Sequence, residues 1–396
     1  MILFLACTLS LTGLAQEATR SRQVPGLRPY DVDLTVMTRE EKDSVRMVAE
    51  LWRNYVESFS KAPADDPDRR NMWVNGSDDY LAEFDDGVLL YSSFRENRLL
   101  DIRKIGPGAY EIVVGTSSKL PGEELNGWIE CVYRVCALNV ADSGDREYNP
   151  FRLRNWLDAV LPILPKTTIG NIDFYCSPGC DVPESVGEET ADFVAALCRE
   201  YGFEHRKRLR YVVAATVDQC EHLSGYLFNA YSNPLMNSMT VKPADVRFYG
   251  RLFGQSTILT NYFDDHRDLC LLIVRSQYPK AMQMLQDGFG FFHGGYMSHS
   301  YETVKSCLKD YLSEHENIDF SEEDLFYDLT MPLKIGESEV VVPIEGLLGS
   351  LFIEYGWKNG GPKLVRKMLS CQDYPELLKV VGVEKEAAGN FIKKLL

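Results

Sequence analysis

The stretch HRDLCLLIVRSQYPKAMQMLQDGFGFFHGG, residues 266–295, opens a part of the chain whose pattern is mainly helical up to its last residue. Cys270 lies in an apolar helical pattern, where a free cysteine behaves as a small hydrophobic residue. Asp287–Gly288 fits a turn before the core aromatics Phe289, Phe291 and Phe292. The glycine pair of this stretch follows no predicted strand and lacks a later glycine, so no phosphate-binding loop is expected.

Four further helices are predicted on the C-terminal side. An apolar helix is expected over 343–355, and Gly356 stands at its end. Pro362 suits the first turn of the next helix, 363–369. Two short helices are expected over the ranges 374–381 and 384–395. This pattern predicts a packed helical subdomain.

On the N-terminal side the pattern predicts a small α/β segment. A strand over 172–175 precedes the turn Ser177–Pro178–Gly179. A helix is expected over 188–201, with Gly202 at the position of a helix C-cap. The β-branched run 209–216 predicts a core strand.

The first third of the chain predicts a separate α+β domain, at about 35–165. The capping box Thr38–Arg39–Glu40–Glu41 opens a helix. Apolar residues fall on one face of that helix: Val45, Val48, Leu51, Trp52, Tyr55, Val56 and Phe59. Extended segments follow at 87–94, 99–105, 109–115 and 128–138, and Gly106–Pro107–Gly108 makes a turn between two of them. One helix followed by a curved antiparallel sheet is a cone-like layout, and it resembles the nuclear transport factor 2-like fold.

The N-terminus predicts export to the periplasm or the extracellular space. Met1–Ala15 is apolar and uncharged, as in a signal peptide, and a polar leader follows over 16–34. Lipid attachment at Cys7 is the alternative, but the few residues before it are too short a helix to engage export. No other segment is long and apolar enough to cross a bilayer.

Charge and cysteine content narrow the classes of partner. A formal net charge of −16 argues against nucleic acid, and the longest basic run, Arg206–Lys207–Arg208, is short. Without Cys7 the chain has nine cysteines, an odd number. Cys176 and Cys180 flank a predicted turn, so a local disulfide is the alternative to two free thiols, which are the favoured interpretation.

The residues from about 170 to 396 resemble a peptidase MA-like (gluzincin) domain, a class of zinc metallopeptidase. The resemblance rests on the phrases His266–Cys270 and Asp287–Gly295 and on the helix that begins Ile344–Glu345–Gly346–Leu347. Val381–Gly382–Val383–Glu384, before the last helix, is similar as well. The expected fold class is therefore α+β: the cone-like domain, the small α/β segment, and a mainly helical gluzincin-like domain.

The resemblance implies a former zinc site that lacks the residues needed for catalysis. His266 matches the first zinc-binding histidine, Arg267 replaces the general-base glutamate, Cys270 replaces the second histidine, and Asp287 matches the third ligand. A guanidinium accepts no proton from water near neutral pH and repels Zn²⁺. Loss of such a base costs about 10²–10⁴ in rate. We therefore expect no catalytic residue and no cofactor, and an exported, non-catalytic protein that binds a ligand or a protein or peptide partner.

Alternative hypotheses remain at this stage. A zinc-dependent hydrolase would use His266, Cys270 and Asp287, with Asp268 as the base. A relocated metal site could use His293 and His299, and Tyr327 is a candidate for stabilising a transition state. A different hypothesis is small-ligand binding in the first domain, through Trp52, Tyr55 and Trp128. Arg267 is also placed to pair with Asp264, Asp268 or Asp287, which would replace the metal pocket with ion pairs.

Overall fold

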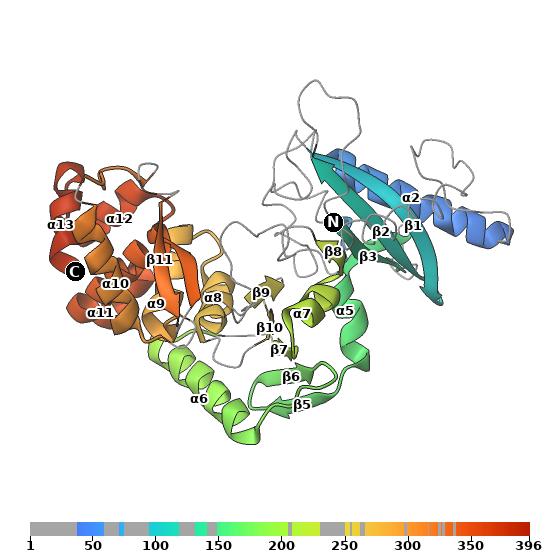
Figure 1. Cartoon of the computed structure of the whole chain (residues 1–396), viewed down its shortest axis with the longest axis horizontal. Helices are drawn as coiled ribbons and strands as arrows, with labels where there is room; N and C mark the ends of the chain where they lie inside the picture. Colours follow the sequence, from blue (N-terminus) through green and yellow to red (C-terminus); the bar gives the residue numbers. More distant parts are fainter. Residues whose placement is uncertain are drawn as a thin grey trace, which may run out of the picture. The chain divides into compact units, whose positions relative to one another are not determined.

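The computed structural model shows a mixed α+β protein (Figure 1). It describes residues 38–58, 71–74, 95–118, 131–140, 149–204, 208–229, 250–253, 256–261, 266–296, 299–315, 317–323, 326, 329–335 and 338–396. Several predicted features lie outside these ranges: the leader with Cys7, the strand at 87–94, Trp128, Asp264 and Tyr327. Contacts divide the chain into two units, 1–163 with 221–243 and 164–220 with 244–396.

The described part of the first unit contains a long helix, a short helix and an antiparallel sheet. The helix α2 spans Arg39–Ser58, and the strands are β1 (Arg95–Gly106), β2 (Ala109–Ser118), β3 (Cys131–Asn139) and β4 (Phe151–Asn155). They pair in the order β1-β2-β3-β4, and β8 (Tyr226–Asn229) also pairs with β3. The short helix α5 (Trp156–Val160) and the 3₁₀ turn Leu161–Ile163 follow β4.

The predicted start of α2 is confirmed. The backbone N–H of Glu41 donates to Thr38 Oγ1 at 3.2 Å, and the N–H of Thr38 donates to Glu41 Oε2 at 3.1 Å. Both bonds satisfy helix-end donors that have no partner within the helix. Five predicted face residues are buried: Val45, Val48, Leu51, Trp52 and Tyr55. This face packs against β4 and β1.

The second unit begins with a mixed sheet. Its strands are β5 (Lys166–Ile169), β6 (Ile172–Cys176), β7 (Leu209–Val213), β9 (Gly250–Phe253) and β10 (Thr257–Thr260). The order is β5-β6-β7-β10-β9, in which β6, β7 and β10 are parallel and the outer strands are antiparallel. The helix α6 (Glu184–Tyr201) joins β6 to β7 and ends at Gly202, which has a φ of 64°, as its C-cap position predicts. The helix α7 (Val217–Ser224) follows β7.

The rest of the second unit is mainly helical, as predicted. Its helices are α8 (His266–Gln277), α9 (Gln283–Gly294), α10 (Tyr301–Glu314), α11 (Ile344–Met368), α12 (Tyr374–Val381) and α13 (Ala388–Leu395), and the 3₁₀ turn Lys385–Ala387 precedes α13. Within α11 the backbone breaks at Gly361, which has a φ of 59° and precedes Pro362, the predicted start of a new helix. The interpretation of Asp287–Gly288 as a turn is wrong, because both residues lie inside α9.

Two features of the fold were not anticipated. The strands β11 (Thr330–Ile335) and β12 (Ser338–Pro343) form an antiparallel hairpin within the part of the chain expected to be mainly helical. The strand β8 lies within the predicted second domain, yet it pairs with the sheet of the first unit.

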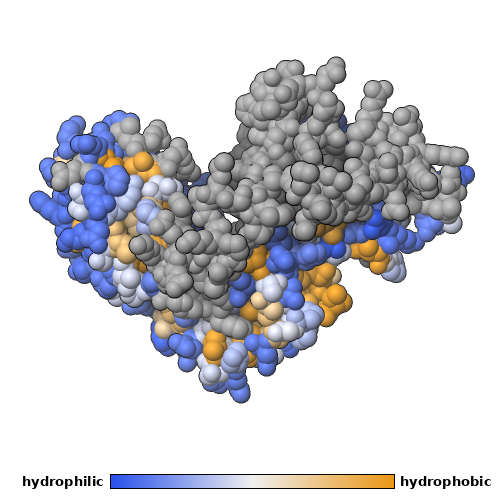
Figure 2. All heavy atoms as spheres, viewed as in Figure 1, coloured by the Kyte–Doolittle hydropathy of each residue, from blue (hydrophilic) through white to orange (hydrophobic). Residues whose placement is uncertain are grey.

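The surface over the C-terminal helices is polar (Figure 2). Over α12 and α13, Figure 2 shows mainly hydrophilic residues, in keeping with the net charge of −16. The exposed large hydrophobic side chains of the described part are Ile105, Ile163 and Leu227. Within the same part, no helix combines the length and the apolar character that a membrane span needs.

Candidate functional site

Glycines bring the three helices of the candidate site into close contact. A Cβ added at Gly288 on α9 would lie 2.2 Å from the carbonyl carbon of Gly349 on α11. A Cβ at Gly294 would lie 2.2 Å from the backbone nitrogen of Arg267, in the first turn of α8. No side chain larger than hydrogen fits at either contact without a backbone shift. The sequence thereby holds the first turn of α8 and the second turn of α11 against α9.

This packing places Arg267 between two carboxylates. Its Nη1 donates to Asp268 Oδ1 at 2.9 Å, and its Nη2 donates to Asp287 Oδ1 at 3.2 Å. The second oxygen of Asp287 accepts from Gln283 Nε2 at 2.7 Å. The guanidinium carbon also lies 4.6 Å from the centroid of the Phe291 ring. The planar, delocalised cation of arginine suits both kinds of contact.

The other two predicted zinc positions have apolar neighbours. The ring of His266 lies 4.4 Å from the ring of Phe193 on α6. Cys270 has no exposed surface and belongs to the hydrophobic core of the second unit. Within the described ranges, no set of three or more His, Cys, Asp or Glu side chains is arranged to hold a metal ion. Because a guanidinium already engages the Asp287 carboxylate, these residues do not fit a bound Zn²⁺.

Glu345, in the first turn of α11, is a buried acidic residue of the site that the sequence analysis did not single out. It is only 6% exposed. The backbone N–H of Met284, in the first turn of α9, lies near the carboxyl group of Glu345 and acts to lower its pKa. Its Oε1 has no hydrogen-bond partner among the described residues. Burial, with the nearby carboxylates of Glu323 and Asp287, raises the pKa of Glu345 to about 7. The sequence feature that could have singled it out is that Glu345 is the one acidic residue in the apolar run 344–353.

His293, proposed for a relocated metal site, is part of a buried aromatic cluster. Its Nε2 lies 2.7 Å from the hydroxyl of Tyr201. The rings of Phe289, Phe292 and Trp357 lie within 6.4 Å of its own ring, between centroids. Burial lowers the pKa of His293 to about 4, so it is neutral at physiological pH. His299 instead lies in a short bridge, where its backbone pairs with that of Tyr296.

Of the three aromatic residues proposed for ligand binding in the first unit, the two described ones, Trp52 and Tyr55, belong to its core. Trp52 and Tyr55 are 3% and 0% exposed. The Trp52 ring lies 6.2 Å from that of Tyr133, and the Tyr55 ring lies 5.4 Å from that of Trp73. Packing of this kind accounts for both side chains without a ligand.

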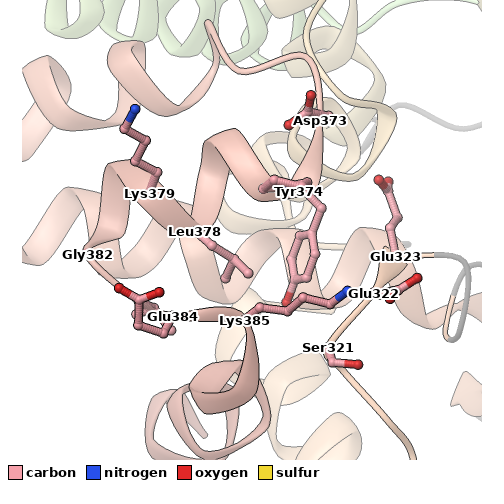
Figure 3. Close-up of a pocket in the computed structure, with 12 residues that line it drawn as sticks. Ser321, Glu322, Glu323, Asp373, Tyr374, Leu378, Lys379, Gly382, Glu384 and Lys385 are labelled. Atoms are coloured by element: carbon pink, nitrogen blue, oxygen red, sulfur yellow. Dashed lines mark hydrogen bonds and ion pairs between the residues drawn. The ribbon is translucent and has the colours of Figure 1, made fainter.

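The second unit also has a surface pocket of about 740 Å³, away from the predicted zinc positions. The helix α12 forms one wall, and the segments 321–323 and 382–385 form the others (Figure 3). Tyr374 and Leu378 contribute buried apolar surface. The Lys385 side chain extends to Glu322, with which it forms an ion pair. Glu323, which lines the pocket, lies near both Tyr374 and Glu345, and its charge acts to raise the pKa of each.

Comparison of the chain with protein-family models, with curated proteins and with solved structures finds no match. Functional assignment therefore depends on the geometry described above.

Proposed function

We propose that this protein is an exported, non-catalytic relative of zinc metallopeptidases that acts by binding a ligand or a protein partner. The observation that carries the proposal is the pairing of Arg267 with Asp268 and Asp287. A peptidase of this class needs a metal and a carboxylate base at this place. Here the residue at the base position is a cation, and it engages the residue at the third-ligand position.

The side chains at the site support loss of catalysis rather than a change of mechanism. The only neighbouring carboxylate proposed as a substitute base, Asp268, accepts a hydrogen bond from Arg267 and is 6% exposed. With one oxygen engaged by Arg267 and little exposed surface, Asp268 is poorly placed to activate a water molecule. The hydrolase hypothesis would also require Cys270 to turn out of the core toward a metal.

The helical arrangement supports a peptidase MA-like origin for the second unit. His266, matched to the first zinc ligand, lies on α8, and Asp287, matched to the third, lies on α9. These two helices pack together. The helix with the Glu–Gly–Leu phrase, α11, packs on α9. The nuclear transport factor 2-like assignment of the first unit is supported by α2 lying on an antiparallel sheet. Export is supported by the apolar leader of the sequence.

The pocket beside α12 is the proposed ligand site of the second unit. Its volume of about 740 Å³ falls in the range of small-molecule sites. Its wall combines apolar surface from Leu378 and Val383 with charges of both signs. The Lys385–Glu322 pair is about half exposed on both sides, so a ligand with its own charges displaces it at little cost.

Zinc content tests the proposal most directly. The protein is saturated with zinc, freed of loosely bound ions and analysed by inductively coupled plasma mass spectrometry. We expect no stoichiometric zinc and no hydrolysis of a peptide library. One tightly held zinc per chain that is lost in His266→Ala would overturn the non-catalytic assignment.

A restoration experiment tests the peptidase origin separately. Arg267→Glu combined with Cys270→His recreates the two-histidine phrase with its intervening glutamate. We expect this double variant to bind one zinc per chain, with Arg267→Glu alone binding none. A double variant whose circular dichroism matches that of the wild type but which takes up no zinc argues against the shared origin.

A further inference from the structure

The turn that leaves β6 carries two thiols at its ends. Cys176 is the last residue of β6, and Cys180 follows Ser177–Pro178–Gly179. The N–H of Cys180 donates to the carbonyl of Ser177 at 3.0 Å, which closes the turn. Gly179 has a φ of 89°, so the turn has proline and a left-handed glycine at its two central positions, as in a type II turn. Its chain direction reverses between the two cysteines.

The surroundings of Cys176 include the chain that follows the turn. Burial raises the pKa of the Cys176 thiol, the nearby Cys180 and Asp181 act in the same direction, and the backbone N–H of Val182 partly offsets them. The Cys180 sulfur lies 3.9 Å from the Oγ of Ser177, the residue next to Cys176. Both cysteines are partly exposed and free, so a small oxidant reaches them.

Hydrogen bonds to neighbouring segments fix the turn in this form. The N–H of Ser177 donates to the carbonyl of Val213, at the end of β7. Gln219 in α7 accepts from Ser177 Oγ at 2.8 Å and donates from Nε2 to the Pro178 carbonyl at 3.2 Å. The two thiols are therefore presented by a preorganised turn, which lowers the entropy cost of joining them.

The remaining described cysteines have a different setting. Cys131, Cys136, Cys220, Cys270 and Cys371 are buried. Cys198 and Cys307 are half-buried and lie on α6 and α10. In the described part of the chain, Cys176 and Cys180 are the two cysteines that share a single tight turn.

We propose that Cys176 and Cys180 form a reversible intramolecular disulfide that closes the turn between β6 and α6. With glutathione disulfide as the oxidant, one cysteine thiolate attacks its S–S bond and releases one glutathione as thiolate. The second cysteine then attacks the resulting mixed disulfide and releases the second glutathione. The two cysteines lose two electrons and two protons, and one glutathione disulfide becomes two glutathione molecules. The loop so closed is short, so the bond constrains the unfolded chain little and stays easily reducible.

Peptide mapping of the full chain tests this proposal. The protein is equilibrated in glutathione buffers of increasing oxidised fraction at about pH 8, where thiolates form. Free thiols are then alkylated, and the protein is digested with trypsin and a glutamate-specific protease, which separates Cys198 from the turn. We expect the turn peptide to lose two hydrogens and to escape alkylation in oxidising buffer. Reduction reverses both changes.

Matched variants distinguish the pair from general oxidation. In Cys176→Ser and in Cys180→Ser, the remaining thiol of the turn is expected to carry glutathione. In Cys307→Ser, the internal bond forms as in the wild type. Complete alkylation of both turn cysteines in folded wild-type protein after oxidation would overturn the proposal. So would a disulfide that joins either of them to a third cysteine. The wild-type map decides the question even if a serine variant fails to fold.

Discussion

Arg267 in α8 reaches α9, where its Nη2 lies 3.2 Å from Oδ1 of Asp287. The same guanidinium holds Asp268 at 2.9 Å, and its side chain is 24% exposed. One cation thus neutralises two carboxylates in a partly buried position. Removing it leaves both carboxylates close together with less solvent than they would have at the surface.

Replacing Arg267 with alanine is expected to lower the free energy of unfolding by about 2 kcal/mol, since the loss for a partly buried pair falls below that for a fully buried one. Arg267→Lys keeps the charge but not the fork that reaches two acids, so a smaller loss is expected. Urea unfolding followed by circular dichroism measures both. Arg199→Ala, at an exposed position on α6, is the control. Equal stability of the two alanine variants would show that the ion pairs contribute nothing.

Gly288→Ala is expected to be among the most damaging single changes in the second unit. The added Cβ would lie 2.2 Å from the carbonyl carbon of Gly349 and 2.5 Å from the Ser350 nitrogen, and neither backbone atom has room to move alone. Separating α9 from α11 costs about 3 kcal/mol or more. Gly389→Ala in α13, where the nearest atom is 3.9 Å away, is the control and should be neutral or slightly stabilising. Thermal unfolding compares them, and a Gly288→Ala midpoint equal to that of the control contradicts the close contact.

Acid should weaken the second unit through His293. Its pKa is 6.5 in the unfolded chain and about 4 in the fold, so below pH 6.5 the unfolded chain binds more protons. The stability it contributes is complete above pH 6.5 and is lost as pH falls toward 4. The loss between pH 7.5 and 4.5 is about 2.5 kcal/mol. In His293→Phe this component is expected to disappear from a series of urea unfolding curves over pH. An unchanged pH dependence in that variant would assign the acid sensitivity to other groups.

Glu345 is expected to act in the opposite direction. Its pKa rises from 4.5 in the unfolded chain to about 7 in the fold, so the folded state binds the extra proton. Stability therefore decreases as pH rises from 4.5 to 7 and stays at the lower level above pH 7. Glu345→Gln, which keeps the shape without the charge, should stabilise the protein at pH 8 by up to about 3 kcal/mol and have little effect at pH 4.5. Glu376→Gln, at an exposed position on α12, is the control. Destabilisation by Glu345→Gln at pH 8 would mean that the carboxylate is ionised and well solvated.

Local signals in the sequence predicted the ends of several elements correctly. Thr38 and Glu41 mark the start of α2 because the capping interaction involves residues within one turn. Gly202 ends α6 because a left-handed C-cap is a local backbone requirement. The hairpin β11–β12 was missed because short apolar runs such as 338–343 do not distinguish strand from buried helix.

The candidate site was predictable only in part. The sequence offered Arg267 three acidic partners; the structure pairs it with Asp268 and Asp287, and Asp264 lies outside the described residues. The pairing with Asp287 depends on Gly288 and Gly294, which set the distance between helices through contacts remote in sequence. The raised pKa of Glu345 likewise arises from burial in the folded protein, beside Glu323 and Asp287. Residue spacing along one helix does not predict such contacts between distant segments.

The pairing of β8 with β3 constrains the order in which the chain matures on the ribosome. Cys131 is paired with Asn229, and the residues between them include β5, β6, α6 and β7 of the other unit. The first sheet thus stays one strand short until residue 229 has left the exit tunnel, by which time part of the second sheet has already been synthesised. The nascent chain must keep the exposed edge of β3 from pairing elsewhere during that interval.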